Sequence, residues 1–307
     1  MECLIIKVFK VRYINFIVLT ILFFHNITSA QDMMDMLEKN EPTKKEITKA
    51  TFKSTRLVNM QTVESLGPRS LDFRISHHFG NLESGPESFW GFDNAASIRI
   101  ALEYSYDGRL MGGIGRTSQG KLMDGFLKYR LLRQSVDGDM PLSVTLFSSA
   151  YYTLEKDASA KSNGFDRYKD RANRFSYCSQ IMLARKFSEK LSLQVSPTYI
   201  HFNQIETSDQ SNDVWAVAGL ARLKMTKRSA VVLEYTHNFN QFPTQGTIKF
   251  YNPLGIGYEI ETGGHVFQMF LTNASGITET QTITNTTTSI EKWGIGFGFN
   301  ISRVFAL

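Results

Sequence analysis

The chain has 307 residues, of which 42% are hydrophobic and 21% are charged, and its formal net charge is +5. This apolar content, together with charges of both signs, excludes an intrinsically disordered chain. Beyond residue 30 the sequence has no run of about 18 apolar residues, which excludes a mature protein that crosses a membrane with helices.

The first 30 residues predict a secretory signal peptide. Three basic residues between positions 7 and 12 precede a mostly apolar stretch at 13–24, and small residues end at Ala30, after which we predict cleavage. An N-terminal membrane anchor is the alternative, but the apolar stretch is short for a helical span. We therefore expect an exported protein.

Charge and cysteine content narrow the partners and the chemistry. Basic residues are scattered singly along the chain instead of forming one stripe, which disfavours a nucleic-acid partner. Cys178 is the only cysteine after the predicted cleavage site, so no internal disulfide is expected. We interpret Cys178 as a small packing residue, with a reactive thiol as the alternative.

Residues 31–66 are polar or mixed in pattern, and we predict that they form a periplasmic lead-in to the following domain. The alternative is that residues 51–66 fold inward as a partial plug. A barrel of about twelve strands lies between barrels filled by side chains and barrels that hold an open channel, so it has room for such a plug.

Residues 67–307 predict one all-β domain. In the segment 71–79, Leu71, Phe73 and Ile75 share one face and Asp72 and Arg74 the other. About twelve segments of this kind follow one another, with a range of about 10 to 14. Their repeated alternation of apolar and polar residues predicts a single antiparallel transmembrane β-barrel.

The last segment, residues 293–307, favours a membrane barrel over a soluble sheet. Aromatic and aliphatic residues occupy one face, and glycines at 294, 296 and 298 occupy the other. In a soluble sheet the glycine-rich face would meet water and stabilise the strand little. In a membrane barrel the aromatic face meets lipid and the small face meets the lumen.

The two faces give two sets of predicted site residues. Those predicted to face lipid are Leu71, Phe73, Ile75, Leu127, Tyr129, Phe267, Met269, Trp293, Ile295, Phe297 and Phe299. Those predicted to line the lumen are Arg74, Arg99, Glu103, Asp124, Lys128, Arg130, Arg222 and Glu234. Because both signs are present, the lumenal charges could line a narrow polar pore or pair with one another and close it.

Connection lengths give an independent indication of the barrel. Short links stand near 107–108, 137–138, 188–190, 226–227 and 262–263, and longer links span 81–95, 154–173, 205–212, 239–251 and 274–290. Outer-membrane barrels pair short periplasmic turns with longer outside loops, so both ends of the domain are expected in the periplasm. The Thr-rich stretch 278–289 is predicted to be an exposed, solvated outside loop that could touch a partner.

Several runs resemble an uncharacterised family of outer-membrane β-barrel proteins from Bacteroidota. They are SLDFRISHHFG (70–80), DGFLKYRLLRQ (124–134), LARKFS (183–188), ETGGHVFQ (261–268) and NISRVF (300–305). The resemblance extends over about residues 51–305 and combines turn, charge and aromatic positions. It implies an outer-membrane barrel and carries no activity and no catalytic residues.

Catalytic chemistry is sparse in the sequence, and we predict no catalytic residue, no metal site and no cofactor. An outer-membrane phospholipase would need a Ser and a His brought together. His77 and His265 fall on the predicted apolar face, and Ser76 points away from His77 because adjacent strand residues point to opposite faces. No paired His spacing typical of metal sites occurs either.

Three functions therefore stay open, with outer-membrane lipid and a small polar solute as the expected partners. The first is a porin-like narrow channel for small polar solutes. The second is a closed structural or surface-interaction barrel. The third, and the least favoured, is an outer-membrane lipid hydrolase.

Overall fold

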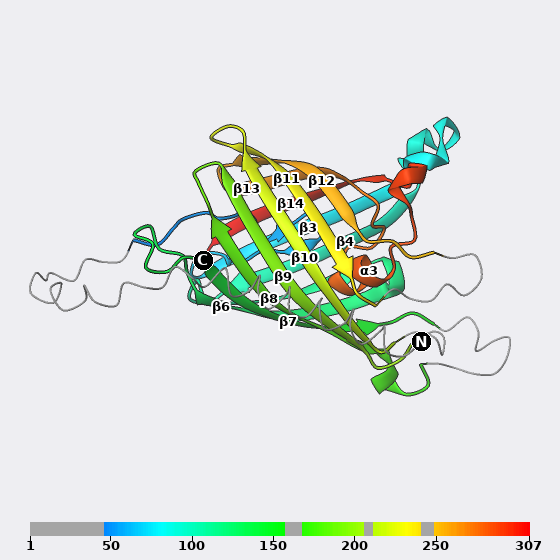
Figure 1. Ribbon diagram of the computed structural model, residues 1–307. Helices are drawn as coiled ribbons and strands as arrows, with labels where there is room; N and C mark the ends of the chain where they lie inside the picture. The colour runs from blue at the N-terminus through cyan, green and yellow to red at the C-terminus, as the bar shows by residue number, and fades with distance from the viewer. Residues whose placement is uncertain (1–45, 157–167, 206–210, 241–248) are drawn as a thin grey trace, which may run out of the picture. The chain divides into compact units, whose positions relative to one another are not determined.

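A computed structural model of the chain describes residues 46–156, 168–205, 211–240 and 249–307 (Figure 1). The predicted signal peptide (1–30) and residues 31–45 of the predicted lead-in lie outside the described residues, as do parts of three predicted long links. Within the described ranges, no helix is long and apolar enough to cross a membrane.

Twelve antiparallel strands form one closed barrel, in which each strand pairs with its neighbours in the chain and β14 pairs with β3. The strands are β3 (Ser70–Asn81), β4 (Ala95–Ser105), β5 (Leu110–Thr117), β6 (Leu122–Leu132), β7 (Ser143–Thr153), β8 (Phe175–Lys186), β9 (Leu191–Phe202), β10 (Asp213–Lys224), β11 (Ser229–Asn238), β12 (Leu254–Thr262), β13 (His265–Thr272) and β14 (Gly296–Ala306). The predicted fold class and strand number are confirmed.

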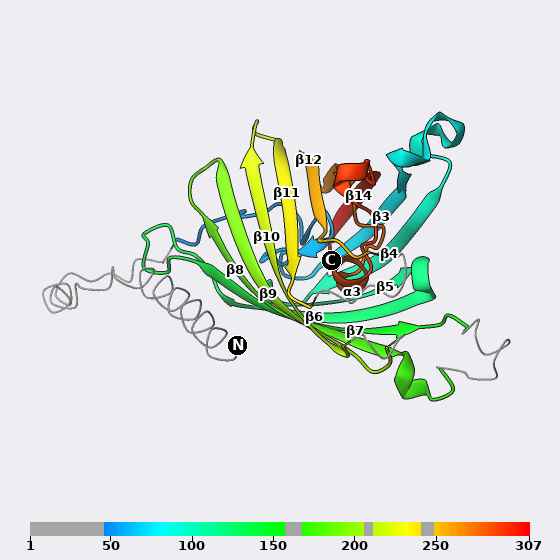
Figure 2. The same cartoon turned by 45° about the vertical axis from the view of Figure 1, so that its right-hand side comes forward.

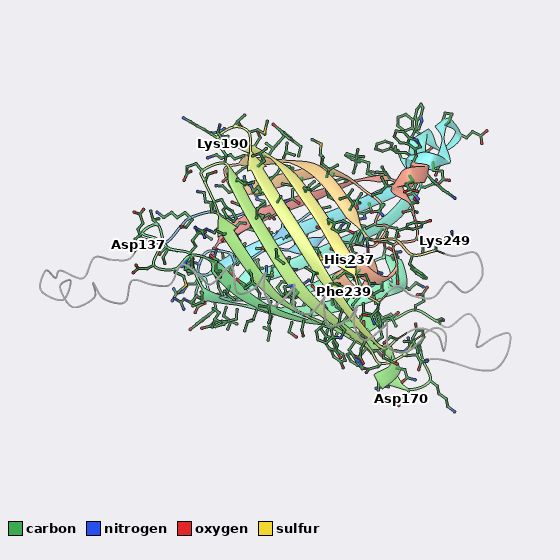
Figure 3. All side chains as sticks on the ribbon, in the orientation of Figure 1. Asp137, Asp170, Lys190, His237, Phe239 and Lys249 are labelled. Atoms are coloured by element: carbon green, nitrogen blue, oxygen red, sulfur yellow. The ribbon has the colours of Figure 1, made fainter. Side chains whose placement is uncertain are left out.

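The two ends of the barrel differ in their connections, and we call them the short-turn end and the long-loop end. In the turn between β4 and β5 at the short-turn end, the Asp107 carboxylate accepts hydrogen bonds from Leu110 N at 2.7 Å and Arg109 N at 2.8 Å. These bonds hold the pKa of Asp107 below its usual range. Figure 3 places Lys190 and Asp137 toward this end, and Lys249 toward the opposite one.

Side chains alternate between the inside and the outside along each strand. Of the residues predicted to face lipid, those that lie on the outward face of a strand are Leu71, Phe73, Ile75, Leu127, Tyr129, Phe267, Met269, Phe297 and Phe299. Leu127, with 64% of its surface exposed, is the most exposed residue of this set. The outside of the barrel is therefore an apolar surface.

The prediction that the last strand begins at Trp293 is wrong. A short 3-10 helix, Ile290–Lys292, precedes Trp293, whose φ of 57° is left-handed and cannot continue an extended strand. Ile295 still accepts a hydrogen bond from Leu82 N at 2.8 Å, but it also lies before β14. Trp293 is 70% exposed and thus points outward from a loop.

A lysine on the outward face tests whether this surface meets hydrocarbon. We expect Leu127→Lys to destabilise the barrel by about 2–4 kcal/mol when folded in vesicles, and Met123→Lys, nearer the strand end on the same face, by about 0–1 kcal/mol. Urea unfolding in vesicles measures both. Equal losses for the two variants would contradict a hydrocarbon-facing belt.

Candidate functional site

The eight residues predicted to line the lumen all have buried side chains at inward-facing strand positions. Several of them form ion pairs within the wall, either along one strand or across strands. Arg74 lies 2.9 Å from Asp72 and 3.7 Å from Glu103, and Arg222 Nε lies 2.8 Å from Glu259. The charges of the wall are therefore largely neutralised by one another.

Arg99 and Asp124 form a bidentate ion pair in this wall. Arg99 Nε and Nη2 donate to the two carboxylate oxygens at 3.0 and 2.5 Å. The guanidinium crosses Gly115, where a Cβ would stand 2.5 Å from Nη2. Glycine at this position is what lets the arginine lie flat between β4 and β6.

Residues 46–66, which we call the inner segment, enter the lumen from the short-turn end (Figure 2, blue). Ile47 forms a bridge with Ser135, and Thr48 N donates to Gln134 O at 2.8 Å. The segment then forms a two-strand hairpin of β1 (Arg56–Leu57) and β2 (Met60–Gln61). Almost all of residues 51–66 are buried.

Polar side chains of the wall bind the backbone of the inner segment. Lys128 Nζ lies 3.2 Å from each of three carbonyl oxygens, those of Thr55, Thr62 and Glu64. The Glu234 carboxylate accepts hydrogen bonds from two consecutive backbone N–H groups at 59 and 60, both at 2.9 Å. These two members of the predicted lumenal set therefore hold the segment in place and do not face open water.

Other predicted lumenal residues contact the inner segment through its side chains. Arg74 donates to Ser54 at 3.0 Å and to Thr55 at 2.7 Å, and Thr55 in turn donates to Glu103 at 2.8 Å. Arg130 forms an ion pair with Glu64. Among the described residues, the Arg99–Asp124 and Arg222–Glu259 pairs have no hydrogen bond to the inner segment, whereas Arg74 has bonds both to the wall and to the segment.

Part of the lumenal wall is apolar, which the sequence analysis did not predict. Inward-facing residues of β8 to β11 pack with the inner segment in one buried cluster that includes Leu57, Met60, Val63, Cys178, Met182, Ile200, Val214, Ala218, Leu220 and Val232. The alternation rule failed on β10, because both of its faces are apolar or small between Val214 and Leu220. Cys178, fully buried in this cluster, is a packing residue in the structure.

The prediction that residues 278–289 form an exposed loop is wrong. After β13 the chain turns into the lumen, and the short helix α3 (Glu279–Thr284) is buried throughout (Figure 1). Threonine hydroxyls donate to carbonyls one turn back, from Thr284 to Thr280 O and from Thr286 to Thr282 O, both at 2.7 Å. These bonds satisfy the hydroxyls, so the Thr-rich stretch needs no water.

The inner segment and this loop meet at four buried side chains, which we call the junction: Arg56, Gln61, Tyr151 and Glu279. Glu279 pairs with Arg56, accepts from Tyr151, and accepts from Gln61 Nε2 at 3.2 Å. Arg56 also donates to Asn59 O at 2.7 Å and to Ile277 O at 3.2 Å. Two parts of the chain that enter from opposite ends are thus joined inside the barrel.

Sequence reasoning missed the junction, although a signal was present. Arg56 is the only charged residue in 54–63, and Glu279 is the only one in 272–289. A solvated segment normally carries several charges, so an isolated charge in each of two polar segments is a sign of two buried partners.

The structure gives no support to the catalytic alternative. The His77 ring stacks on Phe299 at 5.4 Å and, among the described residues, its Nδ1 has no hydrogen-bond partner. His265 lies beside Phe267 at 5.8 Å. Within the described part of the chain, no group of three His, Cys, Asp or Glu residues could hold a metal ion.

Comparisons with known proteins give one match to a family and several to solved structures. The model of a family described as membrane bound beta barrel domain (DUF5777) matches residues 52–305. Among curated proteins, none matches the sequence. The match begins inside the inner segment, so that segment belongs to the shared domain.

Three of the similar solved structures are a NanC porin, a KdgM porin and LpxR from Salmonella typhimurium. For the NanC porin the identity is 10%, the TM-score is 0.46 and the coverage is 77% of this chain and 99% of that one. For the KdgM porin the values are 8%, 0.43, 77% and 99%. For LpxR they are 10%, 0.35, 77% and 100%. At these scores the similarity says nothing about function.

Breaking the junction on one side should destabilise the closed barrel. We expect Arg56→Met or Glu279→Gln to cost about 3–5 kcal/mol each, because the remaining partner stays buried without its counterpart. The double variant should cost less than the sum of the two, since it leaves no unpaired charge. Urea unfolding of the three variants measures this, and additive losses would show that the two side chains do not interact.

Proposed function

The chain belongs to the family of membrane-bound β-barrel domains, and on that basis we propose that it is an outer-membrane barrel that passes small polar solutes when its lumenal contents move. The predicted signal peptide with cleavage after Ala30 supports export. The pairing of short turns with longer loops supports an orientation with the short-turn end in the periplasm. The resemblance to barrels from Bacteroidota supports the same membrane.

The junction is the observation that carries this proposal. The lumen is filled by two separate parts of the chain, and each part is joined to the barrel by its own connection. Where they meet, the main contact is one buried ion pair with its hydrogen bonds. A buried ion pair contributes little net stability, because desolvation offsets most of the attraction. Such a contact suits a lumen in which the inner segment and the loop that contains α3 move apart.

The inner segment supports a role as a partial plug. Its backbone is bound by wall side chains at three levels, through Lys128, Glu234 and Gln194, the last of which accepts from Val63 N at 2.7 Å. Its apolar residues are part of a buried cluster that includes inward-facing residues of β8 to β11.

A closed structural barrel is the second candidate, and the filled lumen favours it. In that case the two lumenal parts are a permanent core, and the outside loops or the outer face carry the function. A lipid hydrolase has no such support, because no serine contacts His77 or His265 among the hydrogen bonds of the described residues.

A reversible disulfide between the inner segment and the wall separates the two candidates. A Cβ placed on Gly255 would lie 3.5 Å from Val58 Cβ, within the range of about 3.5–4.5 Å that a disulfide requires. We expect Val58→Cys/Gly255→Cys, in a Cys178→Ala background, to show conductance steps in planar bilayers when reduced and fewer or none when oxidised.

The single-cysteine variants are the control and should respond to neither oxidant nor reductant. Unchanged steps in the oxidised double variant would show that the passage does not depend on the inner segment. If the wild-type protein and the reduced variant give no steps at all, the channel is excluded and the closed barrel stands.

A further inference from the structure

Seven buried polar atoms on the lumenal face of β3–β5 have no hydrogen-bond partner among the described residues. Two of the seven, Arg74 Nε and Glu103 Oε1, belong to one ion pair at 3.7 Å, and five remain. They are Ser76 Oγ, His78 Nε2, Ser97 Oγ, Arg99 Nη1 and Thr117 Oγ1. Each of these residues is at most 2% exposed. Buried polar groups are almost always satisfied, by protein or by ordered water, so a set of five requires an explanation.

The five atoms belong to one continuous cluster, which we call the hydroxyl cluster. Ser76 stands opposite Arg99, His78 opposite Ser97, and Arg99 opposite Thr117 in the strand registers. Side chains directly opposite each other on one face have Cβ atoms about 4.5–5.5 Å apart. Water or a ligand at this wall would therefore contact several of them at once.

The bonds that the cluster does make fix its chemistry. His78 Nδ1 lies 3.0 Å from Ala274 O, and because a carbonyl only accepts, Nδ1 carries the proton and Nε2 is left as an acceptor. Arg99 uses its Nε–H and one N–H of Nη2 on Asp124, so its charge is neutralised while Nη1 stays available as a donor. The other three atoms are hydroxyl oxygens, which can donate and accept.

We infer that the hydroxyl cluster binds hydroxyl groups, namely water in the closed barrel and a small neutral polyol during passage. A hydroxyl both donates and accepts, and it matches one acceptor, one donor and three groups that do both. An ion finds no uncompensated charge here, so it gains less. The polyol part of this inference rests on the proposed channel, whereas the water part does not.

Strand β10 lies across the barrel from the hydroxyl cluster, and most of its lumenal face has no polar side chain. Four of the five buried lumenal positions on β10 are Val214, Ala216, Ala218 and Leu220, which lie in the apolar cluster together with Cys178 of β8, and the fifth is Arg222, which pairs with Glu259. No side-chain polar atom is present at the four apolar positions to hold water. A hydrated path therefore does not run along this part of β10, whereas β3–β5 offers it five polar groups.

Cysteine labelling of the purified, folded protein tests the inference. In a Cys178→Ala background, Ser97→Cys reports on the cluster, and Ala218→Cys is the control at an equally buried lumenal position. With methyl methanethiosulfonate, a neutral reagent, we expect Ser97→Cys to react about tenfold or more faster than Ala218→Cys, because thiol reactivity depends on access to water. Wild-type Cys178 should react as slowly as Ala218→Cys.

The outcomes separate cleanly. Equal rates for Ser97→Cys and Ala218→Cys would overturn the hydrated cluster, as would no reaction of Ser97→Cys when the same variant reacts fully after unfolding. A positively or negatively charged methanethiosulfonate that outpaces the neutral reagent would overturn the preference for neutral ligands. Labelling does not require conduction, so its result is independent of the bilayer measurement.

Discussion

Closure of the hydrogen-bonded ring is the constraint from which the rest of the structure follows. A backbone group that faces hydrocarbon has no water to pair with, so every strand needs two neighbours and the sheet can have no edge. The pairing of β14 with β3 meets this requirement. It also commits one face of every strand to a narrow enclosed space, and the chain then has to fill that space or hydrate it.

The chain uses both solutions, on opposite sides of the lumen. On the β8–β11 side, apolar side chains pack against Leu57, Met60 and Val63 as in the core of a soluble protein. On the β3–β5 side, ion pairs such as Arg99–Asp124 stand among serine, threonine and histidine side chains. A lumen of this kind is neither a uniform aqueous pore nor a uniform core, and the two sides have different consequences for function.

Much of the barrel could be predicted because its two faces differ chemically on most strands. Where Leu71, Phe73 and Ile75 alternate with Asp72 and Arg74, the period of two shows which face of the strand points outward and which points to the lumen. The apolar side of the lumen could not be predicted this way, because Val214, Ala216, Ala218 and Leu220 alternate with residues that are also apolar. Their partners lie about 150 residues away in the inner segment, and a local pattern contains no information about residues so distant in the sequence.

Similarly, the burial of residues 278–289 depends on Arg56, which only the closed fold brings near. The start of the last strand was mispredicted, because the left-handed backbone of Trp293, and not its polarity, keeps this residue out of β14.

The attachment of the inner segment has a consequence for how the molecule is made. Only Gly67, Pro68 and Arg69 separate Leu66 from the first residue of β3, and a span of four residues reaches at most about 14 Å even when fully extended. The link therefore keeps Leu66 beside the β4–β5 turn, near Gly108, while Ile47 is bound beside the β6–β7 turn. The inner segment thus begins and ends at one mouth of the barrel, and a hairpin anchored in this way can be seated through that mouth without any strand of the ring having to part.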